Sequence, residues 1–188
     1  MPLLLILDLD ETLIYATETP LEREPDFVVG DFFHVYERPG LADFVRSVSA
    51  DFMVAVWTSA SDSYAAAIVR HVFPDPGQLQ FVWTRKRCTY RLDIVTGEAV
   101  GVKNLEKVRR RGFALESVLI VDDRPEGLAR HRGNLIAVTP YAGDPQDDEL
   151  SRLALYLRSI KDQPNVRTID KRGWRRDVDP LRPRPPGR

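Results

Sequence analysis

The chain opens with a run of apolar residues that leads directly into two closely spaced carboxylates. Residues 3–7 are all Leu or Ile, and Asp8 and Asp10 follow them. An uninterrupted apolar run of this length is typical of a strand that is buried on both faces of a parallel sheet. Side chains two apart on a strand share a face, so Asp8 and Asp10 are expected on the same side. Ligands of open α/β sheets bind at the carboxyl ends of such strands, although acidic residues also follow strands simply because loops are solvated.

Strand and helix patterns alternate along the rest of the chain. Apolar residues at helical spacing predict helices over 40–49, 62–72, 103–111 and 147–161. Short apolar runs predict further strands over 52–57, 81–83, 118–121 and 135–138. Gly30 between two apolar runs predicts a flap hairpin, and Thr96-Gly97 predicts a small β insert within 84–102. This alternation is typical of an α/β domain with a central parallel sheet.

The composition fits one soluble domain with a basic end. The net charge is −1, but residues 164–188 contain eight Lys or Arg against three Asp. We expect a domain over 1–163 and a Pro- and Arg-rich tail over 164–188 that is disordered or loosely docked. Cys88 is the only cysteine, which excludes an internal disulfide and favours a reducing compartment. The apolar runs are too short for a signal peptide or a membrane span, so the expected location is the cytoplasm.

Further polar residues stand at the ends of the predicted strands. Thr58 follows the second strand, Lys103 begins a predicted helix, and Asp122 and Asp123 end a later strand. Each of them alone is also typical of a cap, a turn or a solvated surface. Four carboxylates in one crevice would repel by about 4 kcal/mol per close pair at an effective dielectric constant of about 20, so they require a cation. Mg²⁺ suits such oxygen ligands, and Lys103 would add a point charge for a phosphate.

Five short motifs carry a resemblance to a known superfamily. They are Asp8-Leu9-Asp10-Glu11-Thr12-Leu13, Arg38-Pro39, Thr58-Ser59, Val102-Lys103-Asn104-Leu105 and Val121-Asp122-Asp123-Arg124-Pro125. In this order they resemble the haloacid-dehalogenase (HAD) phosphohydrolases. More narrowly, they resemble the branch of RNA polymerase II C-terminal-domain (CTD) phosphatases that is also called NLI-interacting-factor-like. The resemblance covers residues 3–160 and implies a HAD-like (Rossmannoid) α/β three-layer sandwich.

The resemblance assigns a role to each motif residue. Asp8 would be the nucleophile that forms an aspartyl-phosphate, and Asp10 the general acid and then the base. Thr58 would hydrogen-bond the phosphoryl group, and Lys103 would neutralise it. The implied direct ligands of Mg²⁺ are Asp8, Asp123 and the backbone carbonyl of Asp10. Asp122 would support the metal-bound waters. The residues placed at the substrate are Leu9, Thr12, Ser59, Arg85 and Arg124.

The spacing of the motifs leaves no room for a large cap domain. A separate cap needs about 50 residues or more, whereas the intervals before Thr58 and before Lys103 are filled by predicted flap, helix, strand and insert. An open site admits phosphate groups that large partners present. The leading hypothesis is therefore a Mg²⁺-dependent phosphomonoesterase that acts on a phosphoprotein. Arg124 and the basic segment 85–87 depart from the usual pattern of the branch and favour a dianionic or polyanionic substrate.

Three other hypotheses compete with this one. A nucleic-acid end phosphatase would use the basic tail for phosphate contacts and Trp174 as a stacking platform. A catalytically silent phosphodomain would serve as a binding module, although such proteins usually lose a motif aspartate that this chain keeps. A two-component receiver domain also combines acidic residues, Thr and Lys, but there the Lys follows the phosphoacceptor, whereas Lys103 precedes Asp122.

Overall fold

The computed structural model describes residues 2–92, 97 and 99–179, and its core is a five-stranded parallel sheet. The strand order is β10-β9-β1-β5-β6, with β1 in the centre. The sheet strands are β1 (Leu4–Leu7), β5 (Met53–Trp57), β6 (Val82–Trp83), β9 (Val118–Asp122) and β10 (Leu135–Ala137). Leu7 is in register with Val56 on one side and Val121 on the other. The predicted strands are therefore confirmed, and the residues that follow them meet at one edge of the sheet.

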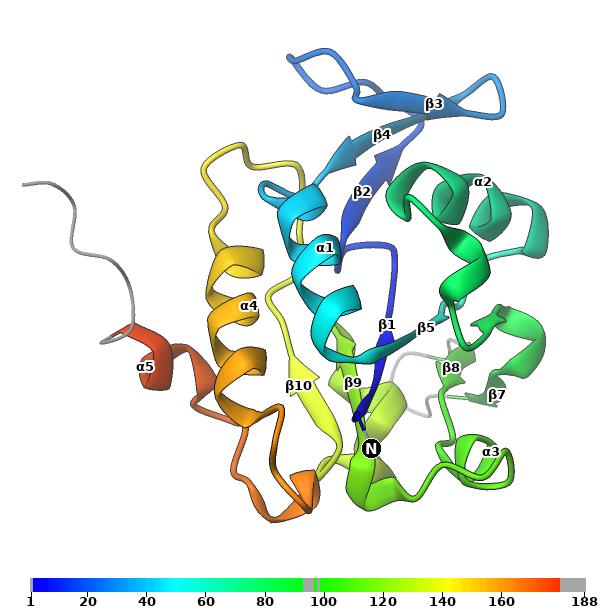
Figure 1. Cartoon of the computed structure of the whole chain (residues 1–188). Helices are drawn as coiled ribbons and strands as arrows, with labels where there is room; N and C mark the ends of the chain where they lie inside the picture. Colours follow the sequence, from blue (N-terminus) through cyan, green and yellow to red (C-terminus); the bar gives the residue numbers. More distant parts are fainter. Residues whose placement is uncertain (1, 93–96, 98, 180–188) are drawn as a thin grey trace, which may run out of the picture.

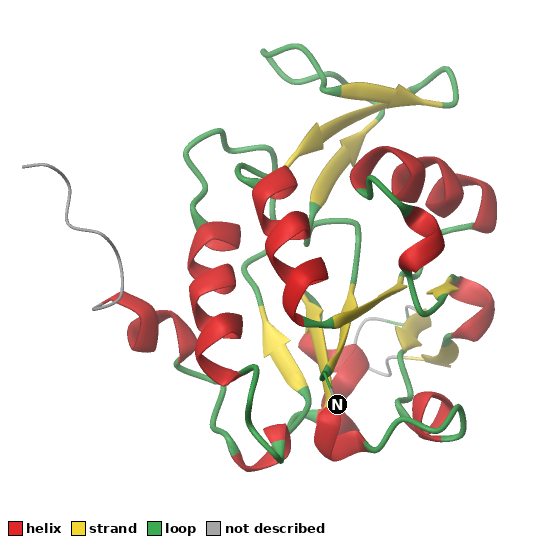
Figure 2. Cartoon of the chain, in the orientation of Figure 1, coloured by secondary structure: helices red, strands yellow, loops and turns green. Residues whose placement is uncertain are grey.

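Helices cover both faces of this sheet (Figures 1 and 2). The α-helices are α1 (Leu41–Asp51), α2 (Asp62–Val72), α3 (Glu106–Arg109), α4 (Glu149–Ile160) and α5 (Trp174–Val178). The 3-10 helices are η1 (Pro76–Gln78), η2 (Arg85–Arg87), η3 (Leu115–Ser117), η4 (Pro125–His131) and η5 (Val166–Thr168).

Side chains of β1 alternate between two hydrophobic clusters, which makes the fold a three-layer sandwich. Leu5 and Leu7 pack with apolar residues of α1, α2, α4 and α5, whereas Leu4 and Ile6 pack on the opposite face with residues of α3, η3 and η4. A strand that is buried on both faces explains the unbroken apolar run in the sequence. The predicted α/β sandwich is confirmed.

The flap and the insert are two small antiparallel sheets. The flap consists of β2 (Ile14–Thr17), β3 (Phe27–Val29) and β4 (Phe33–Glu37), and it projects beyond the main sheet (Figure 1). Gly30 turns between β3 and β4 with a φ of 58°, a left-handed conformation that glycine adopts without steric cost. The insert pairs β7 (Thr89–Leu92) with β8 (Ala99–Val102). The predicted Thr96-Gly97 turn falls largely outside the described residues.

Two expectations about the second half of the chain need correction. The predicted helix over 103–111 is shorter, because α3 begins at Glu106 and Lys103 precedes it. The expectation of a loosely docked tail is wrong for residues 164–179. Trp174 is 1% exposed and donates its Nε1–H to the Ala137 carbonyl oxygen, and Val166 and Val178 are also buried. The apolar residues at the end of the chain therefore complete the hydrophobic cluster beside α4.

None of the helices in the described part of the chain has both the length and the apolar character that crossing a membrane requires.

Candidate active site

Three buried aspartates from neighbouring strands meet at the carboxyl edge of the sheet. Asp8 follows β1, and Asp122 and Asp123 lie at the end of β9. One carboxylate oxygen from each lies within 4.8 Å of the others. Parallel pairing of β1 with β9 brings them together, and the Asp8 N–H donates to the Val121 carbonyl oxygen at 3.1 Å.

A cavity of about 260 Å³ opens onto this cluster. Its walls come from the ends of β1, β5 and β9 and from the insert. The lining residues are Asp8, Asp10, Glu11, Thr58, Ser59, Ala60, Gly101, Lys103, Asp122, Asp123, Arg124 and Gly127. The four sequence-predicted catalytic residues Asp8, Asp10, Thr58 and Lys103 therefore share one cavity.

Lys103 is the cation at the centre of the carboxylates. Its Nζ lies 2.8 Å from Asp8 Oδ1 and 2.6 Å from Asp122 Oδ2. Burial lowers the pKa of Lys103, but the charges of Asp8 and Asp122 outweigh burial and raise it above its ordinary value. Lys103 is therefore a permanent positive charge.

Gly127 allows the segment before Lys103 to pack closely against η4. The backbone N–H of Lys103 donates to the Gly127 carbonyl oxygen at 3.1 Å. A Cβ on Gly127 would lie 2.9 Å from the Gly101 carbonyl oxygen, which is closer than real Cβ atoms come to backbone oxygens. The approach of β8 to η4 thus requires glycine at position 127.

Asp8 is held in a strongly perturbed environment. Burial raises the pKa of Asp8 from its usual 3.8 to about 8, with Lys103 opposing this shift and Asp122 adding to it. Desolvation of a carboxylate costs free energy unless counter-charges are near. One lysine among three buried aspartates leaves an excess of negative charge, and this excess favours binding of a further cation.

The donor set fits a hard divalent cation. The converging atoms of Asp8, Asp122 and Asp123 are all carboxylate oxygens, the ligand type that Mg²⁺ prefers. Both oxygens of Asp122 already accept hydrogen bonds, Oδ2 from Lys103 and Oδ1 from the Arg124 N–H at 2.8 Å. Asp8 and Asp123 are therefore better placed as direct ligands than Asp122.

Tyr64 is a site residue that the sequence analysis missed. It lies in the first turn of α2, where Ser61 caps the helix by accepting from the Tyr64 N–H. Its hydroxyl donates to Asp10 Oδ1 at 2.6 Å. Burial raises the pKa of Asp10, and the hydrogen bond from Tyr64 opposes that rise. The only signal in the sequence was that Tyr64 lies in the first helical turn after the loop that carries Thr58. An aromatic residue at such a position is equally typical of a hydrophobic core.

A buried arginine supports the loop between Asp10 and the flap. Thr12 Oγ1 donates to Asp123 Oδ1 at 3.0 Å, and the Thr12 carbonyl oxygen accepts from Arg38 Nη1 at 3.1 Å. Arg38 has no exposed surface and makes two 2.8 Å hydrogen bonds to Asp147. The motif Arg38-Pro39 thus acts through positioning, and its partner Asp147 was not predicted.

The residues expected at the substrate lie in different places. Ser59 and Arg124 line the cavity and are exposed. Leu9 and Thr12 are fully buried, so their side chains do not face a substrate; Thr12 instead orients Asp123. Arg85 does not line the cavity, although its backbone N–H donates to the carbonyl oxygen of Ala60, which does.

Thr58 is buried at the end of β5. Its Oγ1 accepts from the Ala60 N–H at 3.0 Å, which leaves the hydroxyl hydrogen free to donate into the cavity.

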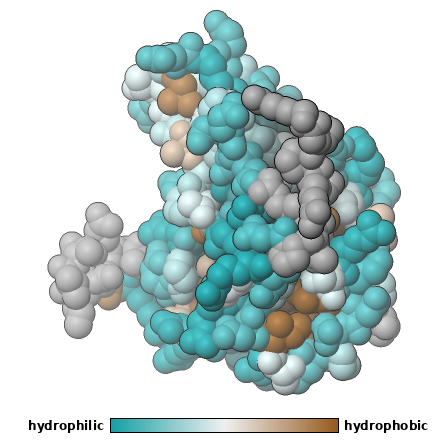
Figure 3. Space-filling model, turned by 90° about the vertical axis from the view of Figure 1, so that its left-hand side faces the viewer, coloured by the Kyte–Doolittle hydropathy of each residue, from teal (hydrophilic) through white to brown (hydrophobic). Residues whose placement is uncertain are grey.

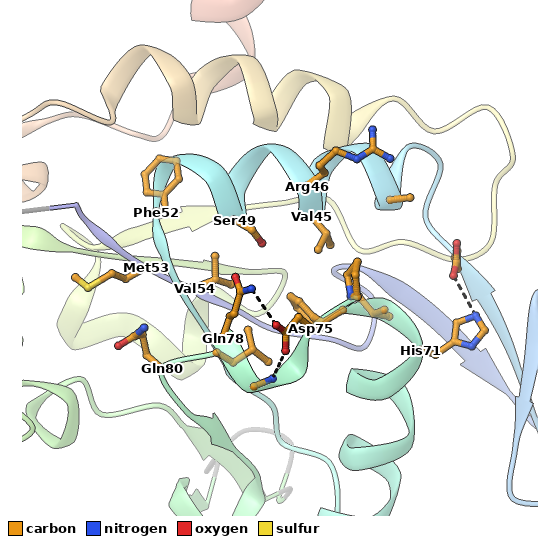
Figure 4. Close-up of a pocket in the computed structure, with 17 residues that line it drawn as sticks. Val45, Arg46, Ser49, Phe52, Met53, Val54, His71, Asp75, Gln78 and Gln80 are labelled. Carbon is orange, nitrogen blue, oxygen red and sulfur yellow. Dashed lines mark hydrogen bonds and ion pairs between the residues drawn. The ribbon is translucent and has the colours of Figure 1, made fainter.

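A larger cavity lies elsewhere, between α1 and the segment that joins α2 to β6 (Figure 4). Its volume is about 790 Å³, and its walls include Val45, Phe52, Val54 and Phe73. Asp75 spans part of it by accepting from the Gly77 N–H and from Gln78 Nε2. None of the aspartates of the carboxylate cluster lines this cavity, so size does not identify the chemical site here.

Comparisons with known proteins agree with this geometry. The chain is 30% identical over 172 residues to the "Probable C-terminal domain small phosphatase" of Dictyostelium discoideum, and the match covers 88% of this chain and 53% of that protein. It is 28% identical to "CTD nuclear envelope phosphatase 1" of Xenopus laevis, covering 88% of this chain and 70% of that protein. The chain thus spans only about half the length of the first of these relatives.

Solved structures share the fold. The RNA polymerase II CTD phosphatase Fcp1-R271A of fission yeast, bound to beryllium fluoride, superimposes with a TM-score of 0.56 at 20% identity. The match covers 95% of this chain and 55% of that one. The family model described as "NLI interacting factor-like phosphatase" matches residues 3–167. This chain therefore belongs to the NLI interacting factor-like phosphatase family.

Proposed function

We propose that this protein is a Mg²⁺-dependent phosphomonoesterase that acts on phosphorylated proteins through an aspartyl-phosphate on Asp8. One observation carries the proposal: a buried lysine and three buried aspartates converge in a cavity that also contains a fourth carboxyl group, that of Asp10, which is held separately by Tyr64. Phosphoryl transfer depends mainly on positioning and charge neutralisation, and this arrangement supplies both.

The proposed reaction has two steps. In the first, a carboxylate oxygen of Asp8 attacks phosphorus, the ester P–O bond breaks, and Asp10 gives its proton to the leaving oxygen. In the second, water attacks phosphorus, Asp10 takes a proton from that water, and the bond from Asp8 to phosphorus breaks. Lys103 holds Asp8 in place, and the Thr58 hydroxyl donates to the phosphoryl oxygens.

Asp8 and Asp123 would hold the metal ion, with Asp122 orienting Lys103 beside it. When bound, Mg²⁺ would act as a Lewis acid and neutralise charge on the phosphoryl group. Thr12 keeps the Asp123 carboxylate turned toward Asp8 through its 3.0 Å hydrogen bond.

A macromolecular substrate agrees with the surroundings of the cavity. Among the described residues, the only elements inserted between the motifs where a cap domain could stand are the small flap and the small insert. The flap carries exposed apolar side chains at Val28 and Phe32, and a hydrophobic patch is visible on the projecting top of the molecule in Figure 3. Exposed apolar groups beside a polar site favour a peptide over a small sugar phosphate.

The nucleic-acid alternative loses its stacking platform. Trp174 is buried against Tyr156 and Ala137 and presents no ring face to a base. The silent-module alternative requires a damaged site, whereas every motif carboxylate is present here.

Removal of the metal ion is expected to abolish turnover. In chelator, hydrolysis of a generic aryl phosphate should fall at least about 100-fold, because only Lys103 then offsets three carboxylates and the phosphate. Added Mg²⁺ should restore the rate, and Ca²⁺ should restore it poorly because it prefers more ligands and longer distances. Full activity in chelator would contradict the proposal, and a folded Mg²⁺-loaded protein without turnover on aryl phosphates and phosphopeptides would favour a binding module.

Tyr64→Phe is expected to shift the alkaline limb of the pH profile of kcat/KM. The Tyr64 hydroxyl stabilises the ionised form of Asp10, so its removal should raise the pKa of Asp10 further. A hydrogen bond to a charged group contributes about 1.5–3 kcal/mol, so its loss should displace the limb measurably. Because Asp10 must be protonated in the first step, the limb should move toward higher pH. An unchanged limb with a uniformly lower rate would instead indicate a purely structural role for Tyr64.

A further inference from the structure

A basic surface beside the cavity takes no part in the chemistry proposed above. We define it as Lys86, Arg87, Arg110 and Arg111, which come from η2 and from the end of α3. Lys107 joins the two segments, because its Nζ donates to the Arg87 carbonyl oxygen at 2.6 Å. Lys86, Arg87 and Arg111 line one groove, and Arg110 lies next to Arg111 in the sequence.

Two of its arginines are held over aromatic rings. The Arg87 guanidinium lies 5.3 Å from the centroid of the Trp83 ring, and that of Arg111 lies 5.4 Å from Phe81 and 5.9 Å from Trp83. Phe81 and Trp83 are stacked with their centroids 4.3 Å apart, and both are buried. Contact with a ring restricts a guanidinium but leaves its N–H donors unused. The aromatic floor thus prepares both groups for an anion.

Local carboxylates neutralise only part of this surface, since Asp62, which also lines the groove, pairs with Lys86 alone. Lys86 pairs with Asp62, and Arg109 pairs with Glu106. In the part of the chain that the structure describes, Arg87, Arg110 and Arg111 make no ion pair with a carboxylate. A groove of about 500 Å³ lies here, with Phe81 and Trp83 as its apolar part and Lys86, Arg87 and Arg111 among its basic residues.

Residues 83–85, which follow or end β6, connect the groove to residues 58–60 of the catalytic cavity by backbone hydrogen bonds. The Trp83 carbonyl oxygen accepts from the Thr58 N–H at 2.8 Å, and the Arg85 N–H donates to the Ala60 carbonyl oxygen at 3.0 Å. Thr58 and Ala60 line the cavity, whereas Trp83 lines the groove. Hydrogen-bonded neighbours thus line the cavity on one side and the groove on the other, so we expect the residues that flank a phosphate in the cavity to face the groove.

We propose that this basic surface binds acidic groups that flank the phosphorylated residue of a protein substrate. The inference rests on the proposed function and narrows its substrate class to phosphoproteins with Asp, Glu or a second phosphate near the scissile phosphate. Guanidinium groups bind carboxylates and phosphates through paired hydrogen bonds, so either source supplies the same chemistry.

Three phosphopeptides with a common scissile phosphate test the proposal. In the first peptide the phosphorylated residue is flanked by glutamines, in the second by aspartates, and in the third by a phosphonate analogue of phosphoserine. The full chain is used to measure kcat/KM for each peptide. The native protein should prefer the two acidic peptides. In the double variant Arg87→Gln/Arg111→Gln, the ratio of kcat/KM for acidic over neutral peptide should fall about tenfold. Any loss of folded protein cancels in this ratio. Arg158→Gln on α4 removes the same kind of charge elsewhere and should leave the ratio unchanged.

The outcomes separate this inference from the proposed function. A preference for aspartate or for phosphonate supports the surface and identifies its anion. Turnover without any preference in the native protein, or an equal loss on all three peptides in the double variant, overturns the inference alone. Failure to hydrolyse any peptide or an aryl phosphate overturns the proposed function and this inference with it. Inhibition by single-stranded RNA at far lower concentrations than by an equally charged peptide would reassign the surface to nucleic acid.

Discussion

Asp8→Asn is expected to lower kcat for an aryl phosphate by more than about 10⁴-fold, the scale seen when a nucleophile is removed from an intact site. Asn has nearly the shape of Asp but carries no negative oxygen that can displace the ester. Lys103, Asp122 and Asp123 all remain, but Asp8 is also a proposed metal ligand, so the rate is compared at saturating Mg²⁺ to separate weaker metal binding from loss of the nucleophile. Single-turnover rates in Mg²⁺ would measure it, together with the absence of a phosphorylated protein intermediate after rapid acid quench.

The stability of this variant distinguishes lost chemistry from lost structure. Burial raises the pKa of Asp8 to about 8. A carboxyl group whose pKa is higher in the folded than in the unfolded protein lowers the free energy of unfolding once the pH exceeds its unfolded pKa. The full decrease is reached when the pH exceeds its folded pKa. Asn removes this cost, so the free energy of unfolding in chelator at pH 8 should be no lower than that of the native protein. Residual activity close to native would refute the nucleophile assignment.

Asp147→Ala is expected to destabilise the protein by about 3–5 kcal/mol, because it leaves the buried Arg38 guanidinium without its counter-charge. Arg38 has no exposed side-chain surface, and Asp147 supplies both of its bidentate hydrogen bonds. Urea denaturation at neutral pH would measure the loss. Asp162→Ala, at an exposed position, is the matched control and should change stability by less than about 0.5 kcal/mol.

The pH dependence of that loss has a defined sign. Burial favours protonation of Asp147, but the hydrogen bonds and charge of Arg38 outweigh burial and lower the pKa of Asp147 below its ordinary value. Stability from such a group is present above the unfolded pKa and is lost as the pH falls through the folded pKa. The difference between native protein and variant should therefore shrink in acid. A difference that stays constant down to low pH would show that the ion pair is not its source.

The carboxylate cluster was predicted because its aspartates follow predicted strands and match the motifs of the resembled family, and parallel pairing of β1 with β9 explains its geometry. Once residues 4–7 and 118–122 are read as adjacent parallel strands, Asp8 and Asp122 must meet at one edge. The flap turn at Gly30 and the Ser61 cap were likewise predictable, since both depend on local backbone chemistry.

Contacts between distant elements could not be predicted in this way. Tyr64 reaches Asp10 across 54 positions, and Arg38 reaches Asp147 across 109. No local pattern determines which buried polar groups will pair over such distances. The end of the chain was misjudged for a similar reason: its Pro and Arg content suggested disorder, but Trp174 has a tertiary site beside α4.

The central position of β1 also has a consequence for how the chain folds. β1 is made before both of its partners, which begin at residue 53 on one side and residue 118 on the other. Until β9 has been made, one edge of this apolar strand has no native neighbour. Closing such long loops slows folding, and the exposed strand edge invites association with other chains. Asp8 is thus made more than a hundred residues before Asp123, so the rate of β1–β9 pairing sets when the two carboxylates first come together.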